Sequence, residues 1–164
     1  MAVTIEEYIC VKDRASALGV VVPHNIAVLP ENFATATSSN EFWQQSEADT
    51  VRKIFRKNNI PVDNIFEIDK TPYIQNNGIE WICPTLFITS GIISENSYMV
   101  SLALNVLSNY ITDLFRGVPG DKKVKFNIVL EKKKNKLCKR ISYEGDIEGL
   151  SELSKIIMKT YNEQ

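Results

Sequence analysis

Three acidic residues are the closest that the sequence comes to a metal-binding site. Glu67, Asp69 and Glu80 lie on or beside segments with the composition of short strands. Carboxylate oxygens are the ligands that Mg²⁺ and Ca²⁺ prefer, so three such side chains on neighbouring strands could share one cation. Acidic residues at strand ends are more often simply exposed to water. A metal-dependent enzyme is therefore kept as an alternative function, and the expectation is a protein without a cofactor.

Other catalytic motifs are missing from the sequence. His24 is the only histidine, and its neighbours Pro23 and Asn25 indicate a loop, whereas nucleophilic triads and zinc sites need an imidazole held by a second group. The sequence contains no G-x-S-x-G elbow, phosphate-binding glycine loop or dinucleotide motif. Asp121 and Glu131 imitate the pattern of restriction-type nucleases, but ten residues of extended strand would hold them roughly 33 Å apart. An enzyme is therefore the less expected class.

Positive charge is concentrated in one segment. Residues 121–140 include nine basic and two acidic side chains, a local charge of +7, against −8 for the rest of the chain. The tip of the hairpin expected there carries Lys132, Lys133, Lys134 and Lys136. Such a basic patch could bind a phosphate backbone, which makes a nucleic-acid-binding module a second alternative. The segment lacks interleaved aromatic residues for base stacking, and lysines also protect sheets from pairing at their edges.

The segment 97–115 supports the leading interpretation. Its apolar residues cover a wide arc of one helix, and the opposite stripe is polar but uncharged, consisting of Ser101, Asn105, Ser108, Asn109 and Thr112. A helix face in water normally carries Lys and Glu, which favour helix, whereas Ser, Asn and Thr are poor helix formers that allow close approach and hydrogen bonding. A second surface is therefore expected to cover this stripe, either elsewhere in the fold or on another chain.

We accordingly expect a non-enzymatic adaptor or accessory subunit that acts through protein–protein interaction. Its partner would be a different protein or a second copy of the chain in a homo-oligomer. The order of long helix, antiparallel hairpin and final helix is similar to that of small accessory components of bacterial operons, which accompany effector or signalling proteins. No motif is shared with them, so this resemblance assigns a role to no residue.

Hydrophobic patterns predict one α+β domain over residues 1–164, with a mixed, largely antiparallel sheet packed by helices and a C-terminal helix–hairpin–helix unit. The expected helices are 4–18, 46–57, 97–115 and 146–161, together with a core helix in 81–93. The expected strands are 25–29, 65–68, 73–74, 79–82, 124–130 and 137–143. Residues 73–74 and 79–82 are expected to pair across a turn at Asn76, Asn77 and Gly78.

The cysteine content and the N-terminal residues predict that the protein resides in a reducing compartment. Cys10, Cys83 and Cys138 are too scattered for a disulfide framework or a zinc site, and each lies in an apolar context. Buried free thiols in a reducing environment are therefore expected. The N-terminal residues do not fit a signal peptide, and no apolar run is long enough to cross a bilayer. The expectation is a cytoplasmic protein without membrane association.

Overall fold

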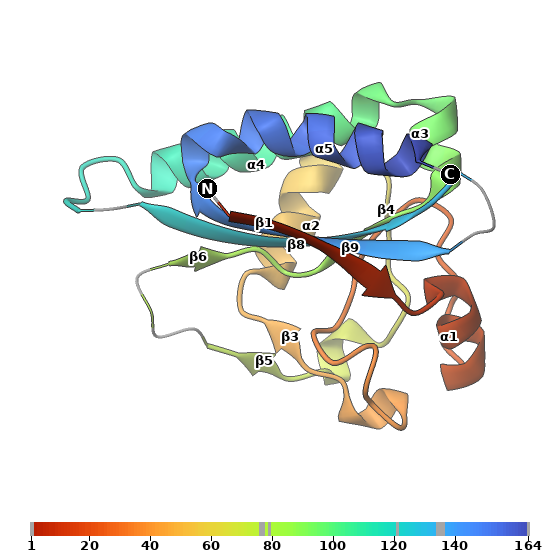
Figure 1. The fold of residues 1–164 in the computed structure, drawn as a ribbon. Coiled ribbons are helices and arrows are strands. Elements are labelled where there is room, and N and C mark those ends of the chain that lie inside the picture. Colours follow the sequence, from red (N-terminus) through yellow and green to blue (C-terminus); the bar gives the residue numbers. More distant parts are fainter. Residues whose placement is uncertain (1, 76–77, 79, 121, 134–136, 164) are drawn as a thin grey trace.

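The computed structural model describes residues 2–75, 78, 80–120, 122–133 and 137–163. They form an α+β fold around a seven-stranded mixed sheet (Figure 1). The strands run in the order β1 (Ala2–Tyr8), β9 (Cys138–Asp146), β8 (Lys123–Glu131), β7 (Leu86–Ile88), β2 (Ile26–Val28) and β4 (Val62–Asp63), and β6 (Trp81–Ile82) also pairs with β8. A separate parallel pair consists of β3 (Gln44–Gln45) and β5 (Tyr73–Ile74).

The centre of the sheet is the antiparallel pair β8–β9, which runs in unbroken register from Lys123 opposite Asp146 to Glu131 opposite Cys138. Alternation of apolar residues along β8 directs its side chains to the two faces of the sheet in turn, as the sequence predicted. β1 extends the sheet antiparallel to β9, and β7 and β6 lie parallel to β8 on its other side. The sheet is therefore mixed, as expected.

Helices cover one face of the sheet. They are α2 (Ala48–Lys57), α3 (Ser90–Glu95), α4 (Tyr98–Leu114) and α5 (Leu150–Asn162), and α4 contacts both α2 and α5. The main core lies between α4, α5 and the sheet, where Leu107, Ile111, Ile128 and Ile141 are fully buried. Burying each such side chain contributes about 1.5–3 kcal/mol. None of the described helices has the length and apolarity needed to cross a bilayer.

The opposite face is covered by α1 (Val11–Leu18) and by the loops that follow β2 (Figure 1). Phe33, Phe42 and Phe87 form a second, smaller core there together with Cys138. The three cysteines are free, and Cys83 and Cys138 are buried as the sequence predicted, whereas Cys10 is only half-buried. Burial raises the pKa of the Cys138 thiol to about 11. A thiol with this pKa stays protonated near neutral pH.

The N-terminal segment differs from the predicted helix 4–18. Residues Ala2–Tyr8 form β1 instead, and the helix begins only at Val11. Cross-strand pairing explains this outcome, because Glu6 and Glu7 form ion pairs with Arg140 and Lys139 of β9. Tertiary pairing thus overrides the local capping pattern that favoured a helix.

Three other predicted elements are also wrong. Residues 65–68 form no strand and lead into a 3₁₀ turn over Ile68–Lys70. The segment 81–93, expected as a helix, contains β6, β7 and the start of α3, because Pro84 and the β-branched residues favour extended chain. β5 and β6 pair with β3 and β8 rather than with each other, and Asn76 and Asn77 of the predicted turn lie outside the described residues.

Candidate protein-binding surface

The exposed side of α4 carries no charge along most of its length. No Asp, Glu, Lys or Arg occurs from Tyr98 to Thr112, although Tyr98 is 65% exposed and Asn105, Asn109 and Thr112 are exposed as well. Solvent-facing helix surface normally carries long charged side chains. The surface of α4 is thus polar enough to be hydrated and neutral enough to be covered at small desolvation cost.

Three stripe residues line a groove between α4 and the start of α5. Asn105, Ser108 and Thr112 form one wall of this groove, which has a volume of about 310 Å³. Apolar side chains from both walls contribute to it, namely Leu104, Ile147 and Leu150, and one side chain of each charge also lines it, namely Lys122 and Glu148. We call this feature the α4–α5 groove.

Only some residues of the uncharged stripe on α4 form hydrogen bonds within the fold. The hydroxyl oxygens of Ser101 and Ser154 lie 3.1 Å apart, so Ser101 joins α4 to α5 within the fold. Thr112 Oγ1 donates a hydrogen bond to the carbonyl oxygen of Ser108 at 2.8 Å. Asn105 and Asn109 stay exposed. Within the fold α5 contacts the stripe at Ser101, while Asn105, Asn109 and Thr112 are exposed, and the role of the stripe as an intermolecular interface stays a prediction.

The basic segment is less positive in three dimensions than in sequence. Lys132 and Lys133 lie at the ends of the described hairpin, while Lys134 and Lys136 fall outside the described residues. Carboxylates neutralise other cations of the segment, in the pairs Lys123–Asp146 at 3.2 Å, Lys125–Glu80 at 3.2 Å, Lys139–Glu7 and Arg140–Glu6. The hydrogen bond and the charge of Lys139 lower the pKa of the Glu7 carboxyl. These carboxylates lower the net positive charge that the segment could present to a phosphate backbone. The structure therefore adds no support for nucleic-acid binding.

The acidic residues considered for a metal site are not brought together. Glu67 pairs with Lys70 at 3.3 Å, and Glu80 pairs with Lys125 at 3.2 Å. The described part of the chain contains no group of three His, Cys, Asp or Glu side chains that could hold a metal ion. The strand expected at 65–68, which would have aligned Glu67 and Asp69 with Glu80, is a loop and turn.

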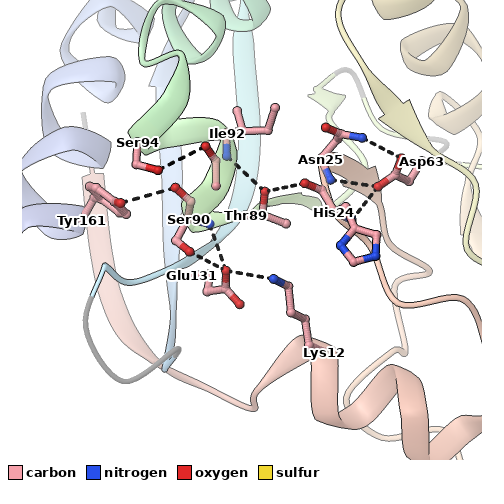
Figure 2. A network of polar contacts seen from close by, with 11 residues as sticks. Lys12, His24, Asn25, Asp63, Thr89, Ser90, Ile92, Ser94, Glu131 and Tyr161 are labelled. Carbon is pink, nitrogen blue, oxygen red and sulfur yellow. Dashed lines mark hydrogen bonds and ion pairs between the residues drawn. The ribbon is translucent and has the colours of Figure 1, made fainter.

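A buried polar cluster at the ends of β7 and β8 was missed by the sequence analysis (Figure 2). Glu131, the last residue of β8, has no exposed surface. Its Oε1 atom accepts hydrogen bonds from the backbone N–H of Ser90 at 3.0 Å and from Ser90 Oγ at 2.8 Å. The ammonium of Lys12 lies 3.4 Å from the same oxygen. We call these three residues the Glu131 clamp, since they join β8, α3 and α1.

A second part of this cluster joins β2 to β4. The Asp63 carboxylate accepts hydrogen bonds from the backbone N–H groups of His24 and Asn25 at 2.7 and 2.8 Å (Figure 2). The carbonyl oxygen of His24 accepts a hydrogen bond from Thr89 Oγ1 at 3.0 Å. The only histidine of the chain takes part in this network through its backbone and lies in the loop before β2, as the sequence predicted.

The chemistry of the Glu131 clamp is structural. Burial alone would raise the pKa of the Glu131 carboxyl, but hydrogen bonds from Ser90 and the charge of Lys12 outweigh it and lower that pKa. A carboxylate stabilised in this way is a weak base, so it activates the Ser90 hydroxyl poorly as a nucleophile. A cleft of about 470 Å³ adjoins the clamp, and the Ser90 and Thr89 hydroxyls that line it donate to protein acceptors. Lys12, His24 and Glu95 line the same cleft. The three residues of the clamp hold β8, α3 and α1 together.

A signal for this cluster exists in the sequence. Glu131 follows the buried run Ile128–Leu130 directly, and a carboxylate at such a position needs a partner when it is buried. Comparison with known proteins adds no guide, since no family model, curated protein or solved structure matches the chain.

Proposed function

We propose that this chain is a non-enzymatic accessory subunit that binds a segment of another protein in the α4–α5 groove. The observation that carries the proposal is the neutral, partly exposed face of α4 next to the α4–α5 groove. Such a combination is typical of a surface that a partner covers, because covering the neutral face of α4 desolvates no charge of that helix face. As an accessory subunit, the protein would accompany an effector or signalling protein in the cytoplasm.

The lining of the groove defines the chemistry of its partner. Ile147 offers half-buried apolar surface to a partner, whereas Leu104 and Leu150 are only 5% and 2% exposed and contribute little. The amide of Asn105 and the hydroxyl of Ser108 are suited to hydrogen bonds with the partner's backbone, since each can donate and accept. One cation and one anion line the groove, so its electrostatic preference is weak. The fitting partner is therefore a segment with apolar side chains and little charge at its centre.

Asn105→Arg is expected to weaken partner binding about tenfold while leaving the fold intact. Asn105 is exposed, so an arginine there strains no packing, but its long cationic side chain would extend over the groove and introduce a charge at a neutral interface. The measurement is quantitative affinity capture from the native cell, with the tagged wild-type chain and the variant compared protein by protein. We expect at least one protein to be captured about tenfold less by the variant, corresponding to about 1.4 kcal/mol.

Asn162→Arg serves as the matched control, because it makes the same substitution at an exposed residue at the end of α5, which does not line the groove. It should capture the same proteins as the wild type. Equal capture by the wild type, Asn105→Arg and Asn162→Arg would show that the α4–α5 groove binds no partner.

A further inference from the structure

The first strand forms a long, regular edge of the sheet. Over all seven of its residues β1 pairs with β9, from Ala2 opposite Glu144 to Tyr8 opposite Cys138. Among the described residues no strand pairs with its other side. The backbone N–H and C=O groups that point away from β9 therefore form a row of available donors and acceptors, as at any sheet edge.

Proteins commonly block such edges, and β1 lacks the usual means. The strand contains no lysine and no proline, and its continuous register leaves no room for a bulge. Its two charges are already neutralised within the chain, because Glu6 pairs with Arg140 and Glu7 pairs with Lys139. The opposite edge of the sheet, β4, is by contrast only two residues long. In the described part of the chain, the sheet thus ends in a short strand at β4 and in a long strand with one unpaired side at β1.

We infer that β1 pairs antiparallel with β1 of a second copy of this chain, which joins the two sheets into one. Residues opposite each other in an antiparallel pair point to the same face, so a two-fold axis must pass through one residue and its own counterpart. An axis at Ile5 aligns all seven residues, with Ala2 opposite Tyr8 and Thr4 opposite Glu6 of the second copy. This register gives the longest pairing that the strand allows.

Side-chain chemistry selects the same register. Ile5 is 46% exposed and lies opposite Ile141, which belongs to the core on the helix-covered face. The axis at Ile5 brings the two copies of this side chain together on that face and covers both. An axis at Glu6 would instead place two glutamates opposite each other, which is destabilising. The axis at Ile5 is therefore the register that pairs the whole strand without placing like charges opposite each other, and a second copy is the occupant that it fits.

The test is the mass of the full chain in solution, measured by light scattering after size exclusion between about 5 and 200 µM, since dimerisation depends on concentration. We expect the mass to rise toward twice that of the chain as the concentration increases. Ile5→Lys should keep the protein monomeric over the whole range, because a lysine at the edge opposes pairing. Ile74→Lys is the matched control, since Ile74 is 48% exposed but lies on β5, and it should dimerise as the wild type does.

A cysteine at the axis tests the register. In Ile5→Cys the two Cα atoms of residue 5 would lie about 4.5–5.5 Å apart, which suits a disulfide, so mild oxidation should link the copies far more completely than it links Ile74→Cys.

A chain that is monomeric at every concentration would overturn the inference. So would a dimer that survives Ile5→Lys, and a dimer that Asn105→Arg abolishes and Ile5→Lys does not would place self-association in the α4–α5 groove. Partner capture is measured separately, so either proposal can fail without the other.

Discussion

Replacing Glu131 by alanine is expected to lower the free energy of unfolding by about 2–4 kcal/mol, because a buried donor left without its acceptor costs about 1–3 kcal/mol and Ser90 has two such donors. The carboxylate is fully buried and accepts both hydrogen bonds of Ser90 as well as the ammonium of Lys12. Alanine would leave the Ser90 N–H and hydroxyl without their acceptor where water does not reach. Urea denaturation followed by circular dichroism measures the difference.

Two further variants separate the contributions within the Glu131 clamp. Glu131→Gln keeps an acceptor for Ser90 but loses the charge. It should therefore lower the free energy of unfolding by less than Glu131→Ala does. Lys12→Met should cost about 1 kcal/mol, because the Lys12 side chain is 30% exposed and its ion pair is partly screened by water. A Glu131→Ala variant within about 1 kcal/mol of the wild type would contradict the structural role of the clamp.

The clamp also predicts how stability depends on pH. The pKa of the Glu131 carboxyl is below its ordinary value of 4.5 in the folded chain, so the folded state favours the ionised form. The resulting stabilisation is fully present above pH 4.5 and is lost as the pH falls through the lowered folded-state pKa. The stability difference between wild type and Glu131→Gln should therefore shrink between pH 6 and pH 3. A constant difference would show that the charge of Glu131 contributes nothing.

The elements that the sequence predicted well are those whose pattern is local. β8 alternates apolar and polar residues, and α4 repeats its apolar residues at helical spacing before Gly117, whose φ of 79° fits a left-handed position after the helix. β2 is a short apolar run between two prolines. In each case neighbouring residues alone determine which side is buried, so no knowledge of the fold is needed.

The features that the sequence analysis missed depend on distant partners. Glu6 and Glu7 look like the first turn of a helix until Arg140 and Lys139, more than 130 positions away, are placed beside them. Ser90 and Glu131 are 41 positions apart, and Lys12 comes from the other end of the chain. The β1 edge and the Glu131 clamp arise only when the strand order is known. A single sequence does not contain that order in any local pattern.

Gly149→Ala is expected to destabilise the fold by about 1–3 kcal/mol, although the backbone at this position is ordinary. Gly149 precedes α5 with a φ of −73°, which any residue adopts. The constraint is space, because an added Cβ would lie 2.0 Å from Tyr143 Oη and 3.0 Å from Tyr143 Cζ. The tyrosine cannot move away easily, since it is 2% exposed and its hydroxyl donates to the Asp146 carbonyl oxygen at 2.6 Å.

A double-mutant cycle identifies this contact as the cause. Tyr143→Phe removes the oxygen that the new methyl group would meet, so the cost of Gly149→Ala should fall by at least about 0.5 kcal/mol in the Tyr143→Phe background. The Cζ contact persists, so part of the cost should remain. Gly19→Ala provides the comparison, because nothing lies within 4 Å of its Cβ position and its φ of +73° makes any cost a backbone effect of about 1 kcal/mol. Urea denaturation measures the change in unfolding free energy for each variant. If the changes for Gly149→Ala and Tyr143→Phe simply add in the double mutant, contact with Tyr143 is not the reason that residue 149 is a glycine.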